Sequence, residues 1–401
     1  MGRKYLLTVF LDGIKTESLR FMPFLSSLKE KRILRTDLGY SVTCHASMYT
    51  GVFPEKHKIW LYWLKNSKNS PYRWLRESGI DSIPDNDFIK YLVYTAAKNI
   101  CKNSSRKGVT YLRSTNFKNW SELSLSEDKS VDDPGYVKEY PTIFEILDNE
   151  GINFEKVGLV KQGSSIKFVE SHEFKKNCFW KYLFIGDIDP ISHIYGQNSK
   201  ECREVLAYID NLVYEKYNEI LMSHGNIDIM CFSDHGHIDA PFDIDIGSFF
   251  ELNGSNIDNF LYVIDSTFAR FWPRDYREEE EIKRVLNELN DKGSLLLEKD
   301  CELYKVRMPD NRYGDVIFII DPPYKFSNPY SPFLKYRNYI RQVSMHGYRP
   351  EIPDMNGIFV SSIPIKRNKI EITLQDVFAS ILDRLGLPIP DYVDGEVIWK
   401  S

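Results

Sequence analysis

The sequence predicts an α/β fold with a mostly parallel central sheet, flanked by helices on both faces and interrupted by two insertions. Short runs of β-branched and aromatic residues end in Asp, Gly or Ser, as buried parallel strands do. Segments with helical periodicity lie between these runs, and this alternation indicates βαβ units. With 401 residues, 42% of them hydrophobic, the chain can bury a sizeable core, which excludes disordered and fibrous proteins.

The expected strands are continuously apolar, which is typical of strands covered on both faces. In chain order they are Tyr5–Leu11, Phe154–Val160, Tyr182–Ile185, Ile227–Phe232 and Gly357–Val360. The expected helices between them are Phe21–Lys31, Glu201–Met222 and Leu374–Leu385. Thr373 is the expected N-cap of the last helix, and Gly386 marks its end.

Two stretches break this alternation, and we expect both to be insertions at the ends of core strands. Residues 60–133 form an aromatic-rich insertion, and residues 241–342 form an inserted lid or cap subdomain. The second has its own expected strands, Phe260–Ile264 and Val316–Ile320, and a charged helix beginning in Glu278–Glu281. The core is then formed by residues 1–240 and 343–401.

The net charge is −5, with acidic and basic residues well mixed along the chain. A general nucleic-acid or anionic-membrane binder needs a basic surplus, so neither class is expected.

The six cysteines are scattered without a C-x-x-C pair, which argues against a zinc site made of thiolates and against a disulfide framework. No apolar run approaches membrane-spanning length, and Tyr5–Leu11 is too short for a signal peptide. We therefore expect no transmembrane segment and a cytoplasmic protein.

Acidic and imidazole side chains follow three of the expected strands. Asp12 follows the first strand, Asp189 and His193 follow Tyr182–Ile185, and Asp234 and His235 follow Ile227–Phe232. A single Asp at a strand end is usually a turn or cap residue. Three such ends, however, meet at one edge of an open parallel sheet, where ligands bind. The pattern predicts one shared site.

Asp and His side chains suit borderline divalent metals, above all zinc. The spacing of four residues places Asp189 and His193 on one side of a helical turn or tight loop. We expect Gly236 to give the backbone the freedom for a sharp turn after Asp234-His235. With His346 as a further imidazole, six groups hold two metals with three protein ligands each. Two such metals clamp the attacking and leaving oxygens of a phosphoryl displacement.

Several motifs occur in an order that resembles the alkaline phosphatase superfamily, most closely its nucleotide pyrophosphatase/phosphodiesterase branch. They are Asp12-Gly13, Ser41 to Gly51 followed by Pro54-Glu55-Lys56-His57, Asp189-x-x-x-His193-x-Tyr195-Gly196, Ser233-Asp234-His235-Gly236, His346-Gly347-Tyr348, and Leu385 to Pro390 followed by Asp394-Gly395. The resemblance covers both ends and the core, but not the two insertions. It implies an alkaline phosphatase-like fold. It also implies one metal on residues Asp189, His193 and His346, and another on Asp12, Asp234 and His235.

The same resemblance places a nucleophile ten residues before the Gly of the Thr-Gly pair. Counting back from Gly51 gives Ser41, whereas an alignment with a two-residue gap gives Thr43. We favour Ser41, because a deletion within the following helix would rotate its core face. Cys44 occupies the place of a family Asn that contacts the phosphoryl group, and His45 matches a family His, so both are candidate substrate-binding residues.

Other conspicuous residues have two readings. His237 is an alternative to His235 as a metal ligand. The aromatic residues between Trp60 and Trp74 either stack a sugar or base, or line the core of their own insertion. Arg270 either reaches the substrate or forms a structural ion pair.

The sequence thus predicts a zinc-dependent phosphohydrolase that cleaves a phosphodiester or phosphoanhydride through a covalent phospho-serine. The cofactors are two divalent metals, most simply Zn²⁺, with Mn²⁺ or Fe as alternatives. The partner is a small phosphorylated substrate: a nucleotide, a nucleotide-sugar or a lipid-linked head group. The alternatives are a phospho-substituent transferase, a phosphomonoesterase, or a catalytically retired metal- or glycan-binding protein.

Overall fold

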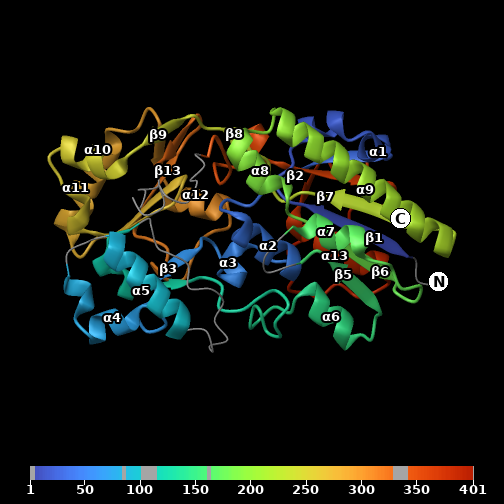
Figure 1. The fold of residues 1–401 in the computed structure, drawn as a ribbon, viewed down its shortest axis with the longest axis horizontal. Helices are drawn as coiled ribbons and strands as arrows, with labels where there is room; N and C mark the ends of the chain where they lie inside the picture. The colour runs from blue at the N-terminus through green and yellow to red at the C-terminus, as the bar shows by residue number, and fades with distance from the viewer. Residues whose placement is uncertain (1–4, 84–86, 101–114, 160–163, 328–341, 401) are drawn as a thin grey trace.

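The computed structural model describes residues 5–83, 87–100, 115–159, 164–327 and 342–400, and it has two lobes (Figure 1). The larger lobe is built on a sheet that, within these residues, has seven strands in the order β17-β2-β16-β7-β1-β6-β5. The strands are β1 Leu6–Leu11, β2 Glu30–Arg35, β5 Phe154–Val157, β6 Trp180–Ile185, β7 Asp228–Phe232, β16 Gly357–Ser361 and β17 Glu371–Thr373. All neighbours pair in parallel except β16, which is antiparallel to β2 and β7. The sheet is therefore mostly parallel.

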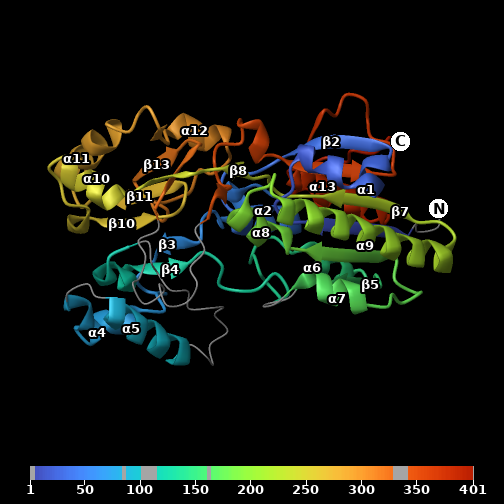
Figure 2. The ribbon, with the colours of Figure 1, turned by 45° about the horizontal axis from the view of Figure 1, so that its top comes forward.

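Helices cover both faces of this sheet, because successive side chains of its strands point to opposite sides. Leu7 and Val9 of β1 pack toward one side with α1, α7, α8 and α9, whereas Leu6 and Phe10 pack toward the other with α2, α6 and α13. The helices are α1 Pro23–Ser27, α2 Ser41–Thr50, α3 Pro54–His57, α6 Ile143–Asn149, α7 Ser165–Ser171, α8 Ile188–Tyr195, α9 Lys200–His224 and α13 Leu374–Arg384. Figure 2 shows the same layers from a second direction.

The expected helix ends near the C-terminus are present. Thr373 caps α13 in a reciprocal pair with Asp376: Thr373 Oγ1 accepts from the Asp376 amide at 3.2 Å, and Asp376 Oδ2 accepts from the Thr373 amide at 2.9 Å. Gly386 follows the helix with a φ of +72°, a conformation that favours glycine.

Two expectations from the sequence were wrong in detail. The Gly357 strand was expected to be parallel, but β16 runs against its neighbours. The helix expected over Phe21–Lys31 is only α1, and the chain then enters the strand β2. In β2, partly buried and exposed residues alternate from Glu30 to Ile33 and the buried Leu34 follows, so its strand character lies in period two rather than in a continuous apolar run.

The second lobe is built around a four-stranded sheet in the order β10-β11-β13-β12, with its own core. Its strands are β10 Leu261–Ile264, β11 Phe268–Trp272, β12 Gly293–Leu295 and β13 Val316–Ile320. Its helices are α10 Ile246–Leu252, α11 Tyr276–Asn287 and α12 Glu298–Leu303. Two further pairs, β8 Ile238–Asp239 with β15 Ser344–Met345 and β9 Phe242–Ile244 with β14 Tyr324–Phe326, lie near its junction with the core.

The aromatic-rich insertion contributes a short antiparallel pair, β3 Trp63–Lys65 with β4 Leu123–Leu125, and the helices α4 Arg73–Glu77 and α5 Asp87–Ile100. Trp63, Tyr72 and Trp120 are buried in one cluster with Trp272 of β11. The insertion therefore packs on the sheet of the second lobe, below it in Figure 2.

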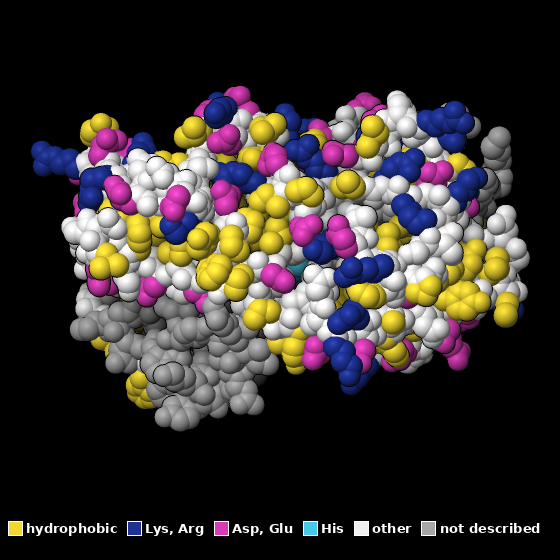
Figure 3. All heavy atoms as spheres, turned by 90° about the horizontal axis from the view of Figure 1, so that it is seen from above, with side chains coloured by type: hydrophobic (Ala, Val, Ile, Leu, Met, Phe, Trp, Pro, Cys, Tyr) yellow, Lys and Arg dark blue, Asp and Glu magenta, His cyan; other side chains and the backbone are white. Residues whose placement is uncertain are grey.

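The face shown in Figure 3 carries acidic and basic side chains intermingled. Among the described residues, no helix is both long enough and apolar enough to cross a membrane.

Candidate active site

The predicted ligands come from the carboxyl ends of three adjacent strands. Asp12 directly follows β1, α8 with Asp189 and His193 follows β6, and Asp234 and His235 follow β7. Since β1 lies between β6 and β7 and all three are parallel, their carboxyl ends open on one crevice.

The first cluster contains Asp189, His193 and His346, which we call the Asp189 group. Asp189 Oδ1 lies 3.4 Å from His193 Nε2 and 3.7 Å from His346 Nε2. His237 joins them, with its Nε2 2.8 Å from the same oxygen. The ligand atoms of all four side chains lie within 4.8 Å of one another. The sequence named His237 only as a substitute for His235, so its place in this cluster was not foreseen.

The second cluster contains Asp12, Asp234 and His235, which we call the Asp12 group. His235 Nε2 lies 3.5 Å from Asp12 Oδ1 and 3.4 Å from Asp234 Oδ2. Asp189 is within 4.8 Å of the ligand atoms of Asp12 and His235 as well, so it joins the two groups. The other oxygen of Asp234 accepts hydrogen bonds from the amides of His235, at 3.0 Å, and Gly13, at 3.4 Å.

The hydrogen bonding of these side chains fits divalent metals. Asp12 Oδ1 and Asp234 Oδ2 are buried and, among the described residues, have no hydrogen-bond donor. His193 Nδ1 donates to the Ser344 carbonyl at 2.9 Å and His235 Nδ1 donates to the Gly236 carbonyl at 3.1 Å, so each Nε2 keeps its lone pair for a metal.

The pKa values of these side chains reflect how closely they crowd together. Burial raises the pKa of Asp12 well above its usual range, and the charges of Asp234 and Asp189 add to it. Burial also lowers the pKa of His237 to about 3. Burial opposes ionisation of Asp189, but its contact with His237 and the neighbouring imidazoles of His193 and His346 hold its pKa well below the usual range. Crowded carboxylates and neutral imidazoles are the donor set that a divalent cation requires.

Gly236 has a different role from the predicted one. Its φ is not in the left-handed region, but a Cβ there would lie 2.2 Å from the Asp354 carbonyl oxygen. Gly236 is needed for this close approach of two backbones rather than for a sharp turn.

The two candidate nucleophiles differ clearly in position. Ser41 is the first residue of α2, lines the pocket, and its Oγ lies 3.1 Å from His235 Nε2. Thr43 is fully buried and its hydroxyl donates to the Trp60 carbonyl, away from the pocket. Only Ser41 therefore faces the clustered ligands, at a helix N-terminus whose amides favour anions.

The two candidate substrate-binding residues on α2 also differ. Cys44 is fully buried in the core, 3.5 Å from Thr36 Oγ1, and burial raises its pKa well above the usual range. Its thiol packs beneath α2 and does not line the pocket, so the structure does not bring Cys44 to the place predicted for it. His45 is partly exposed, and its Nε2 lies 3.8 Å from Asp234 Oδ2.

The Asp189 group opens on a pocket of about 250 Å³ that both lobes line. Tyr40, Ser41 and the Asp189 group lie on the core side, whereas Ile264, Asp265 and Ser266 come from the second lobe. Tyr62, 46% exposed, is the part of the Trp60 to Trp74 segment that lines this pocket. Arg270 is fully buried and pairs with Asp265 at 2.8 Å, which makes it a structural residue of the pocket wall.

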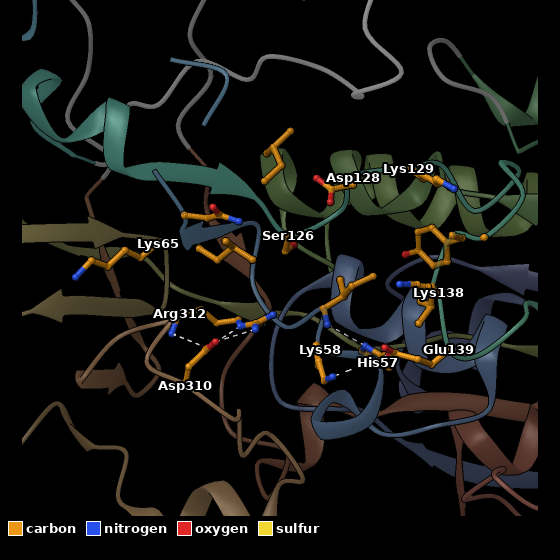
Figure 4. Close-up of a pocket in the computed structure, with 17 residues that line it drawn as sticks. His57, Lys58, Lys65, Ser126, Asp128, Lys129, Lys138, Glu139, Asp310 and Arg312 are labelled. Atoms are coloured by element: carbon orange, nitrogen blue, oxygen red, sulfur yellow. Dashed lines mark hydrogen bonds and ion pairs between the residues drawn. The ribbon is translucent and has the colours of Figure 1, made fainter. Parts of the chain in front are cut away.

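A larger cavity, about 780 Å³, lies between the first insertion, α3 and the second lobe (Figure 4). Lys58, Lys65, Lys138 and Arg312 line it together with Asp310 and Glu139, and none of the predicted ligands does. Arg312 is paired with Asp310 at 2.7 Å. We place the candidate site in the smaller pocket, because Ser41 and the Asp189 group line it.

An open, mostly parallel sheet with Asp and His side chains clustered at its carboxyl edge is an arrangement suited to a metal-dependent α/β hydrolase. The profile of the type I phosphodiesterase/nucleotide pyrophosphatase family matches residues 6–349. The chain belongs to this family, as its motifs predicted, and a phosphodiesterase or pyrophosphatase activity is the activity that membership supports.

Solved structures agree on the fold. Human ectonucleotide pyrophosphatase/phosphodiesterase 5 is similar with a TM-score of 0.65 and 14% identity, covering 98% of this chain and 97% of that one. The murine protein of that name gives 0.65 and 14%, covering 96% of each chain, both alone and as an inactive variant in complex with AMP. A search of curated proteins gave no match. The predicted alkaline phosphatase-like fold is confirmed.

Proposed function

We propose that this protein is a two-metal phosphodiesterase or nucleotide pyrophosphatase that acts through a covalent phospho-serine on Ser41. The observation that carries the proposal is the pocket-facing Ser41 Oγ, 3.1 Å from His235 in a cluster of aspartates and imidazoles. No other hydroxyl predicted as a nucleophile faces that cluster.

The Asp189 group holds one metal and the Asp12 group holds the other. Zinc is the expected ion, because Asp and His side chains are ligands that zinc takes in catalytic sites; Mn²⁺ or Fe are alternatives. When bound, two divalent cations neutralise charge on the attacking and leaving oxygens of a phosphoryl displacement.

The remaining chemistry belongs to the chain itself. Ser41 Oγ forms a bond to phosphorus while the bond from phosphorus to the leaving oxygen breaks, and the serine proton passes to solvent. The leaving oxygen takes a proton from solvent. Water then cleaves the phospho-serine ester, so that one water oxygen ends on the product and Ser41 regains its hydroxyl. His45 Nε2 lies 3.8 Å from Asp234 Oδ2, beside this group.

We propose a nucleotide as the substrate moiety. The complex of the murine relative with AMP supports it, as does a pocket of about 250 Å³ with the exposed ring of Tyr62 at its edge. A nucleotide-sugar or lipid-linked head group is the alternative. Transfer to a glycan stays an alternative, which Tyr62 in the pocket supports and the buried Trp63 and Tyr72 do not.

The test is hydrolysis of bis-p-nitrophenyl phosphate and p-nitrophenyl nucleotides by protein loaded with zinc, manganese or iron. We expect turnover that a chelator abolishes and the metal restores. A rapid quench followed by mass spectrometry should find the substituted phosphoryl group on the peptide that contains Ser41. Protein that holds both metals and turns over none of these esters would overturn the proposal. A cytoplasmic location stays a prediction, which cell fractionation tests.

A further inference from the structure

Three imidazole nitrogens converge on one carboxylate oxygen. Asp189 Oδ1 lies 2.8 Å from His237 Nε2, 3.4 Å from His193 Nε2 and 3.7 Å from His346 Nε2. His237 is thus the nearest of the three, although it is outside the ligand set of six on which the proposed function rests.

The backbone fixes His237 in this position. It directly precedes β8, and His346 directly follows β15. These strands are antiparallel, with Met345 opposite Ile238, so the register continues to place His346 opposite His237. The two ring centroids are 5.2 Å apart, and the His237 side chain has no exposed surface. Its Nε2 is also 3.0 Å from where a Cβ of Gly13 would lie, so the loop after β1 leaves room for this ring.

The hydrogen bonds indicate which nitrogen of His237 carries a proton. Ser344 Oγ donates its single hydrogen to the Ile238 carbonyl at 3.2 Å. It can therefore only accept from His237 Nδ1, which lies 3.3 Å away. That tautomer leaves a lone pair on His237 Nε2, directed at the Asp189 carboxylate.

Two lone pairs at 2.8 Å repel each other unless a cation lies between them. A proton on His237 Nε2 would relieve that one contact, at the cost of the bond from Ser344 to Ile238, and would leave the other two imidazoles facing the carboxylate. A divalent cation satisfies all four donors together. Ligand atoms about 3.3 Å apart are what tetrahedral coordination at 2.0–2.1 Å requires, and the three distances around Asp189 Oδ1 bracket that value.

We infer that His237 is a fourth protein ligand, through Nε2, of the metal that the Asp189 group holds. This inference rests on the proposed function, because it takes the presence of that metal from it. Four protein ligands close a tetrahedral site, whereas three leave a position open. The Asp189 group together with His237 would therefore hold its ion more firmly than the Asp12 group holds the other. The Asp12 group would leave the open position, beside Ser41.

The experiment compares wild-type protein with His237→Ala and His237→Gln. Metal affinities are measured by competition with a chelator, and the cobalt-loaded proteins are compared by visible absorption. Loss of a hydrogen-bonding partner of a ligand costs 10–100-fold in metal affinity. We expect more than about 100-fold for one of the two ions in both variants, an unchanged affinity for the other ion, and an altered cobalt spectrum.

His237→Gln distinguishes a metal ligand from a hydrogen-bond donor, because the glutamine amide can still donate to Asp189 but does not replace the imidazole as a ligand. If His237→Gln keeps both affinities and the wild-type cobalt spectrum, His237 is a donor only and the inference is overturned. His172→Ala is the matched control, since His172 pairs with Glu155 outside the site and its loss should change neither affinity. X-ray absorption of the zinc-loaded wild type provides a measurement without any variant: four imidazoles shared by two ions support the inference, and three overturn it. Wild-type protein that binds no metal, or binds two without turnover, would instead count against the proposed function.

Discussion

The two ligand groups are built from different kinds of structure. The Asp189 group and His237 come from the helix α8 and the β8–β15 ladder, where backbone hydrogen bonds fix each side chain. The Asp12 group comes from the loops that end β1 and β7, and it has Ser41 of α2 beside it. On the proposed function, this difference predicts separate roles: the Asp189 group would retain its ion, and the Asp12 group would hold its ion beside the nucleophile.

The largest effect is expected where the two groups meet. Asp189 lies within reach of both groups, whereas Asp12 belongs to one. Asp189→Ala should therefore lower the bound metal from two ions to less than one per chain, with turnover at background. Asp12→Ala should retain about one ion. Metal analysis after gel filtration measures this, with Asp245→Ala, an exposed helix cap, as the control. Equal metal loss in both aspartate variants would contradict these separate roles.

The next effect separates chemistry from metal binding. Ser41→Ala should keep both metals and lose ~10³-fold or more in turnover, because it removes the atom that attacks phosphorus. Thr43→Val should keep turnover and lose roughly 1–3 kcal/mol of stability, because the buried Trp60 carbonyl loses its donor. Single-turnover kinetics and urea unfolding measure the two. The opposite pattern would make Thr43 the nucleophile.

A third prediction concerns the pocket wall opposite the Asp189 group. Arg270 is fully buried, and it donates to Asp265 and, at 2.6 Å, to the Trp63 carbonyl. Arg270→Met should destabilise the protein by roughly 3–5 kcal/mol, because Asp265 then keeps a buried charge without its partner. Adding Asp265→Asn should restore part of the loss in urea unfolding. No recovery would show that Arg270 acts through packing and not through the ion pair.

The smallest effect concerns Asp37, which lies behind α2 and accepts from Gln375 Nε2 at 3.1 Å. Burial raises the pKa of Asp37 from 3.8 to about 6. The folded state then binds this proton more tightly, so the free energy of unfolding should fall by about 3 kcal/mol as pH rises through 4 to 6. Asp37→Asn should lack this slope, while both metal affinities at pH 7 stay unchanged. Parallel pH profiles of the two proteins would exclude Asp37 as the cause.

Much of the core was predictable because its signals are local. The strands β1, β6 and β7 are mostly apolar and buried, and each is followed by a loop or helix with an acidic residue, so both the sheet and its crevice follow from the sequence. The start of the helix α13 is signalled in the sequence by its N-cap residue, Thr373. The strand β2 was missed because Lys31 and Ile33 face outward and its pairing with β16 is with a distant segment.

The site was less predictable where it depends on contacts between distant segments. His237 faces Asp189 only because two strands of two residues each pair across an insertion of about a hundred residues, and such short strands have no periodic signal. Likewise, nothing local distinguishes Cys44, whose thiol packs beneath α2, from Ser41, whose hydroxyl faces the pocket three positions earlier.

The β8–β15 ladder also connects the second lobe to the core. The chain leaves the core through β8 and returns through β15, so the segment between them is tethered by the two strands that carry His237 and His346. A cation bound to both histidines would link these two connecting strands. Coupling between metal binding and the position of the second lobe is reciprocal. An ion that restrains the lobe would therefore bind more tightly when the lobe closes over the pocket.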